Sequence, residues 1–93
     1  MSSSPSAEPL SVQSTLVEMM DMLAALAWQK IGLQPDMMTG KVVPDLRQAR
    51  LAIDAVNALA QLLEPDLDDE DRRRLRNLLT DLRVNYTEQA GKA

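Results

Sequence analysis

Hydrophobic residues recur along the chain at the spacing of α-helices, and one segment, 45–64, is apolar on two sides. On a helix with about 100° between residues, two adjacent stripes cover more than half of its circumference. The first stripe contains Leu46, Ala49, Ile53, Val56, Ala60 and Leu63, and the second contains Ala52, Ala55, Leu59 and Leu62. A surface helix needs an apolar arc of only about 100°. The pattern therefore predicts a helix that is covered from two sides.

A second helix is predicted over roughly 14–32, with its start between Ser11 and Thr15. Ser14 is one possible N-cap, and Thr15 with Glu18 forms an alternative capping box. Gly32 and Leu33 have the sequence of a Schellman ending, in which a glycine adopts a left-handed conformation. The Ser- and Pro-rich residues 1–11 before this helix are predicted to be a disordered tail.

The third predicted helix spans 68–87, with Asp68 as its N-cap. Its apolar face is narrow and consists of Leu75, Leu78, Leu79, Leu82 and Tyr86. Residues 90–93 are expected to fray, so that 12–89 form a single all-helical domain. Because Pro65 ends the preceding helix and leaves a short link, the helices 45–64 and 68–87 are predicted to be antiparallel neighbours.

The segment 34–43 connects the first two helices and is unusually apolar for a loop. It contains Met37, Met38, Val42 and Val43, together with the turn signals Pro35-Asp36 and Thr39-Gly40. We expect it to fold down over the open end of the helices. A short hairpin centred on Thr39-Gly40 is the alternative.

Composition supports an all-α domain and excludes several chemistries. The chain of 93 residues has no Phe, one Trp and one Tyr, so its core must consist of small and aliphatic side chains, which suit packed helices. It has no Cys and no His, which removes thiol chemistry and the commonest general base and metal ligand. We therefore expect no catalytic residues, no metal and no cofactor.

The charge and the hydropathy pattern of the chain limit which partners it can bind and where in the cell it is expected. The net charge of −4 disfavours binding to nucleic acid or to anionic membranes. The apolar segment 16–33 is interrupted by Glu18, Asp21 and Lys30, unlike a membrane-spanning helix. The polar N-terminus lacks the features of a secretory signal, so we expect a cytoplasmic protein without nucleic-acid or membrane partners.

One interhelical ion pair is predicted from register. Asp54 lies on the narrow polar strip of the helix 45–64. In an antiparallel pair that turns near Pro65, it lies opposite Arg76, with Arg83 as the next candidate. The neighbouring arginines Arg72, Arg73 and Arg74 each follow an acid by four residues, which favours intrahelical pairs over a phosphate-binding patch.

The apolar arcs of the first two helices are wider than one neighbour can cover. We therefore predict a helical homodimer, in which the interface includes Met19, Met20, Leu23, Ala27 and Trp28. The same surface would serve an interaction module for a different protein, which is the alternative hypothesis. The methionines, with Met22, Met37 and Met38, suit either an adaptable binding surface or a core with few aromatic residues. A ligand-binding protein or enzyme would need a pocket, for example under the 37–43 loop.

Three segments carry a resemblance to a known family. They are IGLQPDMMTG (31–40), DLRQARLAID (45–54) and LLTDLRVNY (78–86). With them the chain resembles a family of small bacterial helical proteins, the domain of unknown function 1844. The chain departs from the family before the third helix, where EPDLDDEDR (64–72) replaces a stretch with Lys, Gly and Thr-Pro.

The resemblance implies a helical cytoplasmic protein and carries over no catalytic residue. In the terms of the family, Gly32, Asp54 and Arg83 are the positions of interest. The sequence as a whole indicates a non-catalytic, homo-oligomeric structural or adaptor protein.

Overall fold

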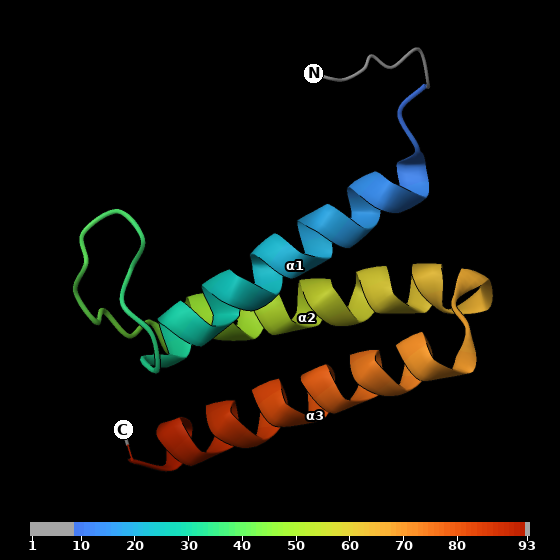
Figure 1. The fold of residues 1–93 in the computed structure, drawn as a ribbon. Coiled ribbons are helices and arrows are strands. Elements are labelled where there is room, and N and C mark those ends of the chain that lie inside the picture. Colours follow the sequence, from blue (N-terminus) through green and yellow to red (C-terminus); the bar gives the residue numbers. More distant parts are fainter. Residues whose placement is uncertain (1–8, 93) are drawn as a thin grey trace.

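The computed structural model describes residues 9–92, which form three long α-helices (Figure 1). They are α1 (Val12–Ile31), α2 (Leu46–Leu63) and α3 (Asp69–Lys92), with a 3-10 turn η1 (Glu64–Asp66) between the last two. No strand occurs among the described residues, which confirms the predicted all-α fold and excludes the hairpin considered for residues 34–43. Most of the predicted N-terminal tail, residues 1–8, and Ala93 lie outside the described residues.

One capping residue and one helix end differ from the prediction. The α1 helix starts at Val12, within the predicted interval, but its N-cap is Ser11, whose side chain accepts the Ser14 backbone N–H at 3.2 Å. Neither Ser14 nor Thr15 has the capping role. The α3 helix continues to Lys92, beyond its predicted end at residue 87. The last turns of α3 lie near the connection between α1 and α2. Gln89 and Lys92 line the same hollow as Gly32 and Pro44.

The ending of α1 agrees with the predicted Schellman motif. Gly32 has φ +97°, its N–H donates to the Gln29 carbonyl at 3.1 Å, and the Leu33 N–H donates to the Trp28 carbonyl at 3.2 Å. The chain leaves the helix and returns to the same point, where the Asp45 N–H donates to the Lys30 carbonyl at 2.8 Å. The two ends of the loop are thus fixed to one turn of α1.

The start signals of α2 and α3 are also confirmed. The Asp45 side chain accepts the Gln48 N–H at 3.1 Å, and the Asp68 side chain accepts the Asp71 N–H at 2.8 Å. Both carboxylates satisfy an N–H group that the first turn of a helix leaves unpaired. Pro65 falls inside η1, which prolongs α2 by one tight turn before the chain reverses.

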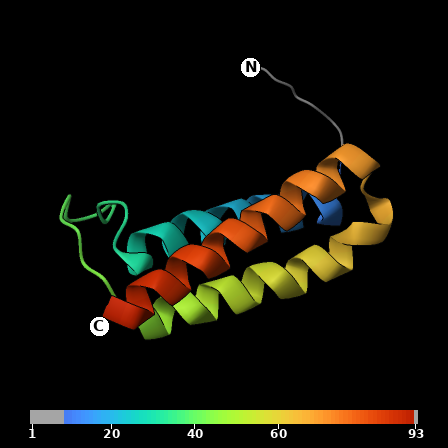
Figure 2. The same ribbon diagram turned by 90° about the horizontal axis from the view of Figure 1, so that it is seen from below.

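The three helices pack side by side, and α2 contacts both α1 and α3 more extensively than these contact each other (Figures 1 and 2). The core is built from alanines and larger aliphatic residues of α1 and α2 and from leucines of α3. Its buried members are Met20, Ala24, Ala27, Ile31, Ala49, Ala52, Ile53, Val56, Ala60, Leu63, Leu75, Leu79 and Leu82.

The leucine face predicted for α3 is confirmed, since Leu78 and Tyr86 also pack against this core. The two-sided cover predicted for α2 is only partly correct. Its first stripe is covered, whereas Leu62 of the second stripe is 66% exposed.

We predict that Gly32→Ala destabilises the fold by about 1–2 kcal/mol, measured by urea unfolding. Alanine at position 32 would have to adopt a left-handed backbone conformation, which costs free energy for a residue with a Cβ. Its Cβ would also lie only 3.1 Å from Cγ of Pro44. Two matched variants separate these causes. Gly40→Ala has the left-handed backbone (φ +71°) with no heavy atom within 4 Å, and should cost about 1 kcal/mol at most. Gly91→Ala, on helical backbone with open space, should stabilise by no more than about 1 kcal/mol.

Candidate functional site

The five residues predicted to form an oligomer surface differ in how far they are exposed in the structure. Met20 and Ala27 are buried in the core of the single chain, and Leu23 and Trp28 are half-buried against that core. Only Met19 is exposed. The prediction is therefore wrong for Met20 and Ala27, because the side of α1 that they occupy already faces α2 and α3.

A different stripe of α1 is open to solvent. Val12, Met19, Met22 and Leu26 are all exposed, and Met22 retains 67% of its accessible surface. Their spacing of seven, three and four residues places them along one line of the helix. Such a line is what a helix presents to another helix.

The α2 helix has a matching exposed stripe. Leu51 and Leu62 are each about two-thirds exposed, and between them lie the half-buried Ala55 and the exposed Ala58. The spacing of four, three and four residues again follows one line of the helix. The sequence already indicated this surface through the second apolar stripe of α2. Two of the four residues of that stripe, Ala55 and Leu62, belong to the surface that α1 and α3 leave open.

The two stripes lie on the same side of the molecule, the side that faces away from α3. On α1, the edge toward α3 is marked by Val17 and Asp21, which share a hollow with Leu75 and Leu78. On α2, the edge toward α3 carries Asn57, Gln61 and Glu64. At about 100° per residue, both exposed stripes fall on the other side of their helices.

We call this surface the outer face. It consists of Val12, Met19, Met22 and Leu26 of α1 and Leu51, Ala55, Ala58 and Leu62 of α2. None of these side chains is charged or polar. An exposed apolar surface of this kind is a candidate site for protein–protein contact.

The loop of residues 33–44 projects from the helices on the side away from α3 (Figure 1). The expectation that it folds over the helix ends is wrong, since Met37 and Met38 are almost fully exposed, Met38 at 93%. Its shape is set by polar contacts within the chain. The buried Gln29 side chain accepts the Met37 N–H at 3.3 Å, and the Gly40 N–H donates to the Asp36 carbonyl at 2.8 Å.

Asp36 organises the tip of this loop. Its carboxylate accepts the backbone N–H groups of Met38 at 2.8 Å and Thr39 at 3.0 Å. These hydrogen bonds, that from Thr39 first, hold the pKa of Asp36 below its ordinary value. The loop therefore presents its two methionines on a defined turn.

We predict that acid loosens this loop before it unfolds the helices. Because the folded pKa of Asp36 is lowered, its contribution is complete above the ordinary pKa of an aspartate and is lost as the pH falls through the lowered value. In an NMR titration, the Met38 and Thr39 amide signals should shift with a midpoint below that of an unfolded aspartate. Asp36→Ala should speed hydrogen exchange in the loop at neutral pH, whereas Asp36→Asn, which keeps an acceptor oxygen, should do so less.

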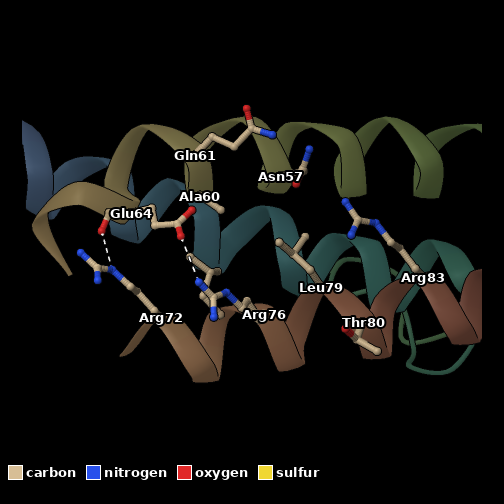
Figure 3. Close-up of a pocket in the computed structure, with 10 residues that line it drawn as sticks. Asn57, Ala60, Gln61, Glu64, Arg72, Arg76, Leu79, Thr80 and Arg83 are labelled. Atoms are coloured by element: carbon tan, nitrogen blue, oxygen red, sulfur yellow. Dashed lines mark hydrogen bonds and ion pairs between the residues drawn. The ribbon is translucent and has the colours of Figure 1, made fainter. Parts of the chain in front are cut away.

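A polar groove runs between α2 and α3, on the side of α2 opposite to the outer face (Figure 3). At one end, the Glu64 carboxylate lies 3.2 Å from the Arg76 guanidinium, and the Arg72 Nε donates to the Glu64 carbonyl at 3.0 Å. The predicted contact between Asp54 and Arg76 is therefore wrong. Arg83, the second candidate, lies across the groove from Asn57 (Figure 3).

The predicted pairing of Asp54 with Arg76 is wrong because of the turn between α2 and α3. Because η1 prolongs α2 past Leu63, the chain reverses later than a turn at Pro65 would imply. This displaces the pairing, so that Arg76 is level with Glu64 and Arg83 with Asn57. Asp54 lies one turn before Asn57 on the polar strip of α2, in a shallow hollow with Arg47, Arg50 and Leu51.

The arginines of α3 are engaged near its N-terminus. Arg74 pairs with Glu70 at 2.6 Å, four residues earlier, and Arg72 pairs with Asp69 at 3.4 Å. These exposed pairs stabilise the first turns of α3 by about 0.3–0.5 kcal/mol each. Of the three pairs predicted at a spacing of four residues, only that of Glu70 with Arg74 is found among the described residues. Its exposure agrees with the interpretation of the arginine run as a solvated face.

Two further observations concern residues 9–92. No helix in this part of the chain is long and apolar enough to span a lipid bilayer. No group of acidic side chains within it is arranged to hold a metal ion.

The fold and its surface define a small all-helical domain of three helices with an exposed apolar face. The chain belongs to the family described as Domain of unknown function (DUF1844), whose family model matches residues 13–88. This match includes all of α2 and nearly all of α1. The comparisons with curated proteins and with solved structures gave no match.

Proposed function

We propose that this protein is a non-catalytic, homo-oligomeric structural or adaptor protein of the cytoplasm that acts through its outer face. The observation that supports this proposal most is the pair of exposed apolar stripes on α1 and α2, which lie side by side and contain no charged residue. The exposure of Met22, Leu51 and Leu62 is costly in water and is relieved when a second apolar surface covers them.

Two-fold symmetry makes self-association efficient for such a surface. In a symmetric dimer each side chain of the outer face is buried twice, once from each chain. Complete burial of a Leu or Met side chain contributes about 1.5–3 kcal/mol. Met19, Met22, Leu51 and Leu62 already bury part of their surface, so each would contribute a fraction of this value in each copy. The sum must exceed the entropy lost on association.

A second candidate is an interaction module for a different protein. The methionines Met19, Met22, Met37 and Met38 favour it, because their unbranched side chains adapt to surfaces of different shape. Both proposed functions use the outer face. They differ in whether a second copy of this chain or a different protein binds to it.

We predict that the pure protein has a mass of twice 10.3 kDa at about 50 µM, measured by sedimentation or light scattering. Met22→Lys and Leu51→Lys, tested separately, should each shift it toward the monomer, because each places a charge in the apolar contact. Circular dichroism should show unchanged helicity, since both side chains are about two-thirds exposed in the single chain.

Val84→Lys is the matched control. Val84 is a half-exposed apolar residue on α3, and the substitution changes the net charge by the same amount. It should leave the mass of the dimer unchanged. A monomeric wild-type protein at this concentration would refute self-association, and stoichiometric capture of a different protein, abolished by Met22→Lys and retained by Val84→Lys, would then favour the second candidate.

A further inference from the structure

We infer that the groove between α2 and α3 contains a binding site for a carboxylate group, centred on Arg83. The groove lies on the side of α2 opposite to the outer face, so this inference goes beyond the proposed function. It has a volume of about 380 Å³ and is lined by residues of both helices (Figure 3). This volume is within the range of small-ligand sites, roughly 300–1,000 Å³.

The two ends of the groove differ in the residue that faces the arginine. At one end, the Arg76 guanidinium lies 3.2 Å from the Glu64 carboxylate. Arg83 follows Arg76 by seven residues, and Asn57 precedes Glu64 by seven. The helices are antiparallel and seven residues are close to two turns, so Arg83 faces Asn57 as Arg76 faces Glu64 (Figure 3). At this second position the groove has an arginine without an acid.

Arg83 is the one arginine of the groove that has no partner within residues 9–92. Arg72 and Arg76 both bind Glu64, the first through its backbone carbonyl and the second through its carboxylate. Arg83 forms neither an ion pair nor a side-chain hydrogen bond in this part of the chain. Asp54 lines a separate hollow of α2. The guanidinium of Arg83 is thus free to bind an anion from outside the chain.

The charge of the groove favours a carboxylate as this anion. The lining residues include three arginines and one acid, Glu64, so the groove is positive in a chain whose net charge is −4. A guanidinium binds a carboxylate or a phosphate through two parallel hydrogen bonds. The side-chain NH2 group of Asn57 can donate a further one. Glu64 and the net charge of the chain repel a second negative charge, which disfavours phosphate.

The deepest part of the groove is apolar. Ala60, Leu75 and Leu79 line it and are buried in the core. A ligand that fits this surface therefore combines a carboxylate with a short apolar portion. Two sources have this chemistry: the glutamate side chain of a protein segment and a free short-chain carboxylic acid.

NMR titrations with four probes test the site and its source. Butyrate represents the free acid, and the peptide acetyl-Ala-Glu-Ala-amide represents the protein segment. Butyramide has no charge, and inorganic phosphate is the competing anion. The carboxylate probes should shift the Arg83 Nε–H and Asn57 side-chain signals to saturation, and butyramide should not. The carboxylate that binds more tightly identifies the source. Absence of any shift with both carboxylates refutes the site, and tighter binding of phosphate refutes the assigned ligand class.

Three variants that each lower the net charge by one separate this site from general charge effects. Arg83→Gln removes the guanidinium and should weaken carboxylate binding by about tenfold or more. Asn57→Glu places an acid opposite Arg83, as Glu64 is opposite Arg76, and should block the site to a similar extent. Arg73→Gln, at an exposed position on the same helix, is the matched control and should bind as the wild type does.

Wild-type affinity in Arg83→Gln, or an equal loss in Arg73→Gln, would overturn the inference. Circular dichroism should show unchanged helicity in Arg83→Gln and Arg73→Gln, since both side chains are exposed. The mass of the dimer should also be unchanged in these two variants, because the groove and the outer face lie on opposite sides of α2. Failure of the carboxylate site therefore leaves the proposed self-association intact.

Discussion

The close contact between α1 and α2 is the constraint on which the rest of the structure depends. These two helices contribute five alanines to the core, of which Ala27 and Ala49 are completely buried and Ala24, Ala52 and Ala60 nearly so. Small side chains allow two helix backbones to approach closely and leave little room between them for larger ones. The long side chains of Met19, Met22, Leu51 and Leu62 therefore lie outside this contact. The outer face is thus a direct consequence of how the core is packed.

Local signals in the sequence were sufficient for most helix ends. The Gly32-Leu33 ending and the caps at Asp45 and Asp68 were predicted correctly, because each depends on residues no more than four positions apart. The leucine face of α3 was also predictable, since a narrow stripe has only one possible orientation toward the core.

The orientation of α1 and the register of α3 were not accessible in the same way. On α1, apolar residues occur almost all around the helix, so the pattern does not decide whether Met19 or Met20 faces inward. The orientation of α1 depends on its alanines, Ala24 and Ala27, which pack in the core. The pairing of Arg76 with Glu64 rather than Asp54 depends on η1, a turn whose length the sequence pattern did not specify.

The loop shows how polar contacts can replace burial. Its four apolar side chains led to the expectation of a buried segment. In the structure, the Asp36 carboxylate, the Gln29 side chain and the bond from Asp45 to Lys30 fix the backbone without help from the core. A loop whose backbone is satisfied in this way can display apolar residues in water. The cost of that exposure falls on the side chains, and most of it on Met37 and Met38.

The five alanines among the thirteen buried core residues also limit how stable the single chain can be. Burial of a side chain stabilises in proportion to its apolar area, and an alanine contributes much less than a leucine. Among the completely buried residues, the largest are only Ile31, Leu82 and Val56. In the proposed dimer, much of the large apolar surface that the chain possesses would be buried between copies rather than within one. Folding and association would then be linked by mass action, and the stability of the helices would rise with protein concentration.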